Sequence, residues 1–281
     1  MFGSKTRRRL LFAAVACVVL AIAAQVEAQF RQRGGFNRGF GNVRKATFKD
    51  FDGRFQFCRV AFSSDFRGDG GNWSVDFPRA DINLSIRLSE LTKTDVSKDG
   101  SGEPNHLLVQ LTDPELFSCP FIMMTEVGSA SFNQQEAAAL RLYLEKGGFL
   151  WADDFWGTFA WQWWEAQLRN AMPADKYPIV DLQPDFPLFQ TQFDVKKTPQ
   201  ISSIGFWASN GGSTSERGAD SATVHTRAIL DDHGRVMVLM THNTDLGDSF
   251  EREGDDPRYF YEMSVPGYAF GINALLYAMS H

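Results

Sequence analysis

Carboxylates and one imidazole follow the ends of predicted strands, and these side chains can carry acid–base or metal chemistry. The candidate catalytic residues are Glu126, Asp153, Asp154 and His242. Each follows a run of apolar residues such as Phe121–Met124, which is typical of a strand that is covered on both faces. In an open α/β sheet, ligands bind at the carboxyl ends of the strands, where these residues would meet. The pattern therefore predicts either a general acid–base pair or a site for a divalent cation at this edge.

Neighbouring polar residues extend the candidate site. The candidate metal ligands are Asp153, Asp154, His242 and Asp245, and the candidate ligand-binding residues are Asn243, Asp245, Asp248 and Trp156. A structural interpretation competes with this one, because an Asp-Asp pair after a strand often caps the next helix and a lone His near Asn and Asp is often a hydrogen-bonded loop residue. Convergence of the side chains in one cleft would favour a site, and dispersal would favour structural roles.

Two further segments near the same edge contain reactive residue types. The acidic segment Asp245–Asp256 could bind calcium, but it lacks the regular spacing of an EF-hand loop, so we expect a solvated loop. Ser129 and Ser131 offer hydroxyl groups, but the residues around them lack the full Gly-x-Ser-x-Gly motif of a serine hydrolase.

Five tryptophans gather in one part of the chain, and they are Trp151, Trp156, Trp161, Trp163 and Trp164. Their ring faces could bind sugar rings, or they could pack one helix against the sheet. On a helix, Trp161, Trp163 and Trp164 cannot all point the same way. We therefore expect at least one of them to face solvent, a neighbouring segment or a partner.

The elements that position these residues alternate between strands and helices. Strands are predicted at 55–63, 107–111, 121–124, 149–152, 201–207, 224–230 and 235–241, and helices at 79–91, 134–146, 158–171 and from Ser264 or Pro266 to the end. The segment Tyr177–Pro199 is expected to be irregular. The strand–helix–strand unit at 121–152 requires a parallel pair with a right-handed connection. The order of elements predicts a doubly wound α/β domain.

Four stretches resemble one bacterial family. They are Phe121–Thr125 with Gly128 and Phe132; Glu136–Asp154; Asp185–Phe189 with Phe193; and Met237–Glu251 with the closing GYAFGINALLYAMSH. The family is called domain of unknown function 4159, and it is similar in fold to class I glutamine amidotransferase-like domains and trehalose-utilisation-like proteins. The resemblance implies a flavodoxin-like, doubly wound, mostly parallel sheet in a single domain over residues 51–281. It implies no established activity.

The chain departs from its amidotransferase-like relatives at the nucleophile. Those relatives use a Cys on a sharp strand-to-helix turn, with His and Glu as partners. Here the strand runs into Glu126-Val127-Gly128, where members of the family commonly show Gly-His-Gly. Cys119 precedes this strand and Cys58 lies inside another, which argues against glutamine amidotransfer.

Residues 1–28 are expected to be a cleavable export signal. A basic segment precedes the apolar run Leu10–Ala24, and Val26-Glu27-Ala28 supplies small residues at the cleavage positions. The run is short for a membrane span, and an uncleaved anchor is the alternative. Thr6–Leu11 also resembles a twin-arginine signal, while an ordinary secretory signal remains open. We predict a periplasmic or secreted protein without a transmembrane anchor after cleavage.

Residues 29–50 are basic and rich in Gly, Arg and Phe, and we expect a disordered linker there. The whole chain still has a formal net charge of −6, so the remainder is acidic, and its repulsion of phosphate argues against nucleic-acid binding. Export would allow Cys58 and Cys119 to pair. Because both lie in apolar, strand-like segments, we expect buried thiols instead of a disulfide.

Two functions remain open, and the residues do not decide whether the protein is an enzyme. The first is an exported, non-catalytic binding or interaction module of the bacterial cell envelope, with an envelope protein or a small-molecule or glycan ligand as its partner. The absence of a complete catalytic motif favours it. The second is a metal-dependent or acid–base hydrolase that acts on an envelope glycan or peptide, with a divalent cation as its cofactor.

Overall fold

The computed structural model describes residues 44–281. The predicted export signal and residues 29–43 of the predicted linker lie outside this range. The described domain begins before the predicted boundary at residue 51, because Ala46 is buried and Lys45 forms a parallel bridge with Leu108 at the edge of the sheet. The last part of the predicted linker is therefore ordered.

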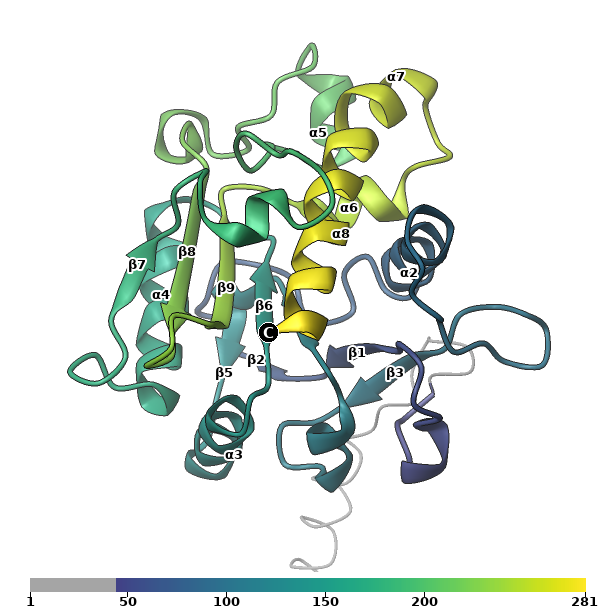
Figure 1. Cartoon of the computed structure of the whole chain (residues 1–281). Helices are drawn as coiled ribbons and strands as arrows, with labels where there is room; N and C mark the ends of the chain where they lie inside the picture. Colours follow the sequence, from purple (N-terminus) through teal and green to yellow (C-terminus); the bar gives the residue numbers. More distant parts are fainter. Residues whose placement is uncertain (1–43) are drawn as a thin grey trace, which may run out of the picture. The chain divides into compact units, whose positions relative to one another are not determined.

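The strands form one large sheet and one small ribbon. In chain order they are β1 (Phe57–Val60), β2 (Ser63–Ser64), β3 (His106–Val109), β4 (Ile122–Thr125), β5 (Ala130–Ser131), β6 (Leu150–Asp153), β7 (Ile179–Asp181), β8 (His225–Leu230) and β9 (Val236–His242). Within the described residues, the large sheet has seven strands in the order β3-β1-β4-β6-β9-β8-β7 (Figure 1). Its pairs are parallel, except that β8 runs antiparallel to both β9 and β7. The ribbon pairs β2 with β5.

Helices cover both faces of the large sheet. The α-helices are α2 (Arg79–Leu91), α3 (Gln134–Glu145), α4 (Gly157–Ala171), α5 (Ile204–Ser209), α6 (Leu246–Glu251), α7 (Pro257–Tyr259) and α8 (Val265–Ser280), and a π-helix spans Phe260–Ser264. Helix α3 begins with the predicted capping box, since Asn133 accepts from the backbone of Glu136 and the Glu136 carboxylate accepts from that of Asn133. The predicted fold class, a mostly parallel α/β sheet in a single domain, is confirmed.

The hydrophobic core consists of two layers, one on each face of the sheet. Met124 and Ala152 pack with α3 and α4 on one face, which we call the α4 face. Their neighbours Met123 and Trp151 pack with α2, α6 and α8 on the other, which we call the α8 face. This alternation follows from the two-residue period of a strand, and it also decides which face each residue at the strand ends will meet.

The order of the sheet contains a switch point between β1 and β4. From β1 the chain crosses outward to β3, and it then returns past β1 to form β4. Helix α2, which follows β1, therefore covers the α8 face, whereas α3, which follows β4, covers the α4 face. The loops that leave β1 and β4 separate at the carboxyl edge, which is where flavodoxin-like sheets bind their ligands.

Two predicted elements are wrong. Residues 201–207 do not form a strand, because the segment continues into α5, where the Ile204 N–H donates to the Asp248 carboxylate at 2.6 Å. The segment Asp245–Asp256 is not a solvated loop, because it contains α6 with Phe250 buried in the core. The expected irregular segment Tyr177–Pro199 is confirmed except at its start, where β7 pairs with β8. Long-range contacts explain both errors, and neither contact has a local signature in the sequence.

The prediction of two buried thiols is also wrong, because Cys58 and Cys119 form a disulfide. Cys58 lies in β1 and Cys119 lies just before β4, and these neighbouring strands bring the two Cα atoms to 6.1 Å. Both side chains point to the α4 face. Strand order decides the pairing, and strand order is not local information.

Among the described residues, no helix combines the length and the apolar character that a membrane span requires.

Candidate functional site

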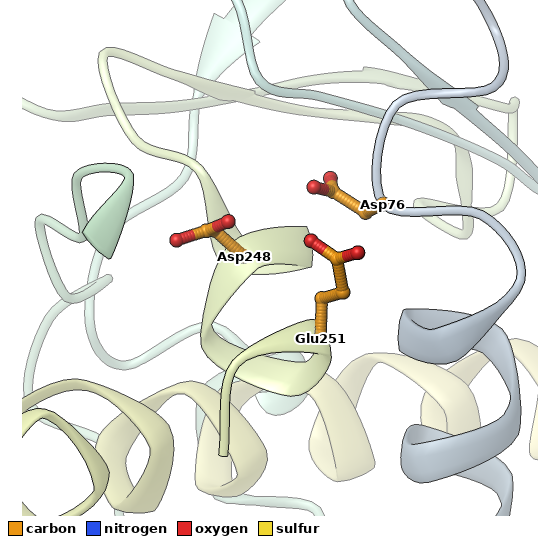
Figure 2. A group of neighbouring side chains, drawn as sticks. All are labelled: Asp76, Asp248 and Glu251. Atoms are coloured by element: carbon orange, nitrogen blue, oxygen red, sulfur yellow. The ribbon is translucent and has the colours of Figure 1, made fainter. Parts of the chain in front are cut away.

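Carboxylates from three segments meet at the carboxyl edge of the sheet, and we call Asp76, Asp154, Asp245, Asp248 and Glu251 the carboxylate cluster. One oxygen from each of Asp76, Asp154 and Asp245 lies within 4.8 Å of the other two. The same holds for Asp76, Asp248 and Glu251. Figure 2 shows Asp76 projecting from the chain before α2 toward α6, which carries Asp248 and Glu251. Asp76 therefore belongs to both groups.

The local backbone explains how these side chains converge. Asp248 and Glu251 are three residues apart on α6 and therefore share one side of the helix. Asp245 caps the same helix, since its carboxylate accepts from the Asp248 N–H at 2.8 Å. Asp154 and Asp76 have φ angles of 55° and 62°, in the left-handed region that Asp tolerates better than most residues. Asp154 directly follows β6 and Asp76 lies in the turn before α2, and both carboxylates come close to Asp245 at the start of α6.

The inner part of the cluster is buried, and the nearby charge of Arg59 opposes the resulting rise in the pKa of Asp76 without pairing with it. Asp76 is 7% exposed, and Asp154 and Asp245 are each 4% exposed. Within residues 44–281, none of the three forms an ion pair with Lys or Arg. Burial, together with the neighbouring carboxylates, raises the pKa of all three well above the ordinary value for Asp.

One oxygen of the cluster has no hydrogen-bond partner. Asp76 Oδ2 is fully buried and accepts no hydrogen bond from any described residue. The backbone of Gly247 approaches this oxygen so closely that a Cβ there would lie 2.3 Å from it. Buried polar atoms are normally satisfied, so this oxygen requires an explanation.

A buried arginine lies near the cluster but is committed elsewhere. Arg59 on β1 pairs with Asp81 on α2, and both side chains are completely buried. Nη1 of Arg59 donates to the Val75 carbonyl at 3.4 Å, and this hydrogen bond holds the backbone next to Asp76 in place. Arg59 therefore helps to position Asp76 without forming an ion pair with it.

Asp153, a predicted catalytic residue and metal ligand, anchors α6. Its Oδ1 accepts from the Thr241 hydroxyl at 2.5 Å, and its Oδ2 accepts from the N–H groups of Leu246 at 2.9 Å and Gly247 at 3.1 Å. Burial raises the pKa of Asp153 to about 7, although these donors oppose the shift. Its hydrogen bonds give it a structural role, but at the start of α6 and not at the next helix, α4, which the structural alternative expected.

Glu126 lies next to the cluster, directly after β4. A Cβ on Gly70 would lie 2.6 Å from Glu126 Oε2, so glycine lets the loop after β1 cover this carboxylate. Burial, with the charges of Glu216 and Asp69, raises the pKa of Glu126 to about 7, although the Gly71 N–H opposes the shift. A carboxyl group with this pKa can donate or accept a proton at neutral pH.

His242 does not join the carboxylates, because it points to the α4 face. Its Nε2 donates to the Gly157 carbonyl at 3.0 Å, and its Nδ1 accepts from Arg227 at 3.3 Å. The ring stacks on Phe155 and His225. Burial, with the charge of Arg227 nearby, lowers the pKa of His242 to about 4, although the Gly157 carbonyl opposes the shift. Both ring nitrogens are occupied, so the structure does not bring His242 together with its predicted partners.

Asn243 and Trp156, two predicted ligand-binding residues, hold loops together. Asn243 accepts from the Gly157 N–H and donates to the Thr223 carbonyl, each at 2.7 Å. Trp156 donates from Nε1 to Asp154 Oδ1 at 2.9 Å, and it is 5% exposed. Trp156 therefore contacts the cluster, whereas Asn243 connects elements at its side.

The tryptophans divide into buried and partly exposed groups. Trp151, Trp156 and Trp164 are buried, whereas Trp161 and Trp163 are half-buried. Arg227 stacks on Trp161 with its guanidinium carbon 3.9 Å from the ring centroid, and Arg67 lies 6.0 Å from that of Trp163. This division matches the expectation that the helix cannot bury all of its tryptophans.

Phe159 and Arg67 both contact the ring of Trp163, and together with Phe66, the chain neighbour of Arg67, we call these residues the aromatic surface. Phe159 is 53% exposed, and its ring centroid lies 6.4 Å from that of Trp163. Phe66, the chain neighbour of Arg67, is 96% exposed. The surface combines ring faces with the guanidinium of Arg67, whose Nε and Nη2 donate to Asp65 at 3.1 Å and 2.7 Å and whose remaining N–H groups have no hydrogen-bond acceptor among the described residues.

A pocket of about 560 Å³ opens elsewhere along the same edge, and its lining includes Asp181, Lys197, Thr198, Gln200, His225 and Thr226. None of the predicted site residues lines it.

A family model described as Domain of unknown function (DUF4159) matches residues 56–279. The chain belongs to this family. A search of curated proteins found no match. The likeness to amidotransferase-like and trehalose-utilisation-like proteins stays a prediction.

This member of the DUF4159 family has no free thiol among its described residues, since Cys58 and Cys119 are bonded to each other. Ser129 is 2% exposed and donates to the Gly71 carbonyl at 2.8 Å, so its hydroxyl is also occupied. The residues of the chain thus supply carboxylates, and no activated nucleophile accompanies them in the described part.

Sequence reasoning missed Asp76 and Glu251 in this DUF4159 domain. Asp76 is separated from β1 by a long loop, so it did not read as a residue at a strand end. The available signal for Asp76 is its position just before α2, the crossover helix that follows β1. Glu251 was assigned to a solvated loop, and only the helix α6 turns it toward Asp76.

Proposed function

We propose that this protein is an exported, non-catalytic binding module of the bacterial cell envelope and that it binds a glycan through its aromatic surface. The observation that carries the proposal is the exposure of Phe159 beside Trp163 and of Phe66 beside Arg67, which also contacts Trp163. Aromatic faces in water gain free energy by covering apolar area, and a sugar ring offers a flat apolar face of matching size. Arg67 would add hydrogen bonds to the hydroxyl groups of the sugar.

The distribution of the predicted catalytic residues supports binding over catalysis. His242 and Asp153 belong to opposite faces of the sheet, so they do not form an acid–base pair. The carboxylates Asp154 and Asp245 are too deeply buried to reach a polymeric substrate.

The disulfide between Cys58 and Cys119 supports export, because such bonds persist in oxidising compartments. A periplasmic or secreted location would place the aromatic surface among envelope glycans. The signal predicted at residues 1–28 would provide the route.

The test is retention of the purified mature protein on insoluble envelope glycans, compared between two variants. Phe66→Ser combined with Phe159→Ser should reduce retention at least about tenfold, the equivalent of a loss of roughly 1.4 kcal/mol. Phe117→Ser is the matched control, because Phe117 is 44% exposed and lies outside the aromatic surface. Equal retention of all three proteins would contradict the proposal, and capture of an envelope protein by the same surface would replace the glycan with a protein partner.

A second candidate, a hydrolase of envelope glycan or peptide, is favoured by one observation. Glu126 has a pKa of about 7 and lies at the switch point, as a general acid would. Incubation with envelope glycan and peptide should then release reducing ends or amines, and Glu126→Gln should abolish the release. Turnover that Glu126→Gln removes would make the hydrolase the better function, and no turnover would leave the binding module.

A further inference from the structure

We propose that Asp76, Asp154 and Asp245 bind a calcium ion inside the domain. The proposal does not depend on the aromatic surface, since its residues lie on the α8 side of the sheet edge and are buried. It keeps two of the predicted metal ligands, Asp154 and Asp245. It replaces Asp153 and His242, whose polar atoms have other partners, with Asp76.

The geometry suits a single ion. Oxygens from the three side chains lie within 4.8 Å of one another, which is compatible with metal–oxygen distances of about 2.3–2.6 Å for calcium placed between them. Each ligand comes from a different segment: Asp76 precedes α2, Asp154 follows β6, and Asp245 caps α6. An ion here would join the segments that meet at the switch point.

The unpartnered oxygen of Asp76 is the second, independent observation. Only 7% of Asp76 is exposed, and its Oδ2 has no hydrogen-bond donor in the described part of the chain. An ionised carboxylate buried without a partner is very costly, and proteins avoid the cost by pairing the charge or coordinating a metal. No arginine or lysine pairs with any of the three carboxylates among the described residues.

The overlapping group of Asp76, Asp248 and Glu251 is a poorer site. Asp248 Oδ2 already accepts from the Ile204 N–H and from the Tyr259 hydroxyl. Arg252 lies 3.5 Å from Asp248 and 2.9 Å from Glu251, so a cation is already present on that side. In the group with Asp154 and Asp245, no described Arg or Lys forms an ion pair with a ligand, and Arg59, whose charge acts on Asp76, is paired with Asp81.

The ligand chemistry selects calcium. Three carboxylates with no imidazole or thiolate are hard oxygen ligands, which suit calcium or magnesium better than zinc or copper. Magnesium usually keeps several waters and takes one or two carboxylates, whereas calcium accepts many protein oxygens in a flexible cage. Three buried carboxylates from separate segments therefore fit calcium.

The first experiment measures calcium in the purified mature protein after chelator treatment and dialysis against calcium. One equivalent per chain is expected. The midpoint of thermal unfolding should rise by roughly 5–10 °C when free calcium is about 100-fold above the dissociation constant. Terbium, which replaces calcium, should luminesce on excitation of tryptophan, because Trp156 is hydrogen-bonded to Asp154, and calcium should displace it.

Two variants and one control keep the result interpretable. Asp76→Asn and Asp154→Asn should each remove the calcium-dependent shift, while their calcium-free forms should melt at or above the wild-type midpoint because a buried charge is gone. Asp232→Asn removes an exposed carboxylate and should leave the shift unchanged. A variant that had lost its calcium response because its fold was damaged would instead melt below the calcium-free wild type.

Three results would overturn the proposal. The first is no bound calcium and no rise of the thermal midpoint at calcium concentrations up to about 10 mM, which is above the weakest range of extracellular calcium modules. The second is a calcium-dependent rise that survives in both variants, and the third is an equal rise with magnesium. A wild-type protein that binds calcium but is not retained on envelope glycans would reject the proposed function alone.

Discussion

The carboxylate cluster and the surroundings of His242 occupy the same edge of the same sheet, yet their electrostatics are opposite. On the α8 side, Asp76, Asp154 and Asp245 are buried together without a paired cation. On the α4 side, His242 is buried with Arg227 and His225. Thr241 and His242 are adjacent in β9 but point to opposite faces, so one residue step separates an anionic environment from a cationic one.

The two environments move the pKa values of their buried groups in opposite directions, and the physical cause is the same in both. Burial disfavours charge, and neighbours of like sign add to that effect. The pKa values of the carboxyl groups therefore rise, while the pKa of His242 falls to about 4. Residues that look like partners in the sequence are thus kept apart on opposite faces of the sheet.

The largest effect should come from removing Arg59, a completely buried cation beside the cluster. Arg59→Met leaves Asp81 buried and unpaired, and breaking such a pair costs about 3–5 kcal/mol. Urea denaturation should detect this loss of unfolding free energy. Adding Asp81→Leu should recover most of the loss, and a double variant no more stable than Arg59→Met would show that the pair is not the cause.

The disulfide on the α4 face should rank next. It closes a loop with a sequence separation of 61, for which loop-closure entropy gives roughly 4 kcal/mol. Cys58→Ala with Cys119→Ala should lower the unfolding free energy by about this amount in urea. Dithiothreitol should destabilise the wild type but not the double variant, and a wild type that is insensitive to reduction under unfolding conditions would contradict the assignment.

The pH dependence of His242 should be smaller and of definite sign. Its folded pKa of about 4 lies below the unfolded value of 6.5, so its contribution is present above pH 6.5 and is lost as pH falls toward 4. The shift corresponds to about 3 kcal/mol between these limits. His242→Gln should make the unfolding free energy less sensitive to acid over this interval, and an unchanged pH profile would reject the cationic environment.

The smallest effect on stability should come from the aromatic surface. Phe66 is 96% exposed, so Phe66→Ser should change the unfolding free energy by less than about 0.5 kcal/mol. Thermal and urea unfolding would measure it. A larger loss would mean that Phe66 packs against the domain in solution, and the surface would then be structural.

Local patterns predicted the parts of this domain that depend on neighbours in the chain. The apolar runs before Glu126 and Asp154 correctly predicted β4 and β6, and the Asn133 capping box correctly predicted the start of α3. The same patterns failed at α5 and α6, where contacts with distant residues such as Asp248 decide the conformation.

The sequence by itself determined the α/β class, the parallel β4–β6 unit and the concentration of carboxylates at one edge, because these follow from periodicity and from the direction of parallel strands. The tertiary structure decided which carboxylates meet. It brought Asp76 to Asp154 and Asp245, moved His242 to the other face, and joined Cys58 to Cys119. The reason is physical: strand order and the face of each residue are set by packing between segments far apart in the chain, and that packing has no local signature.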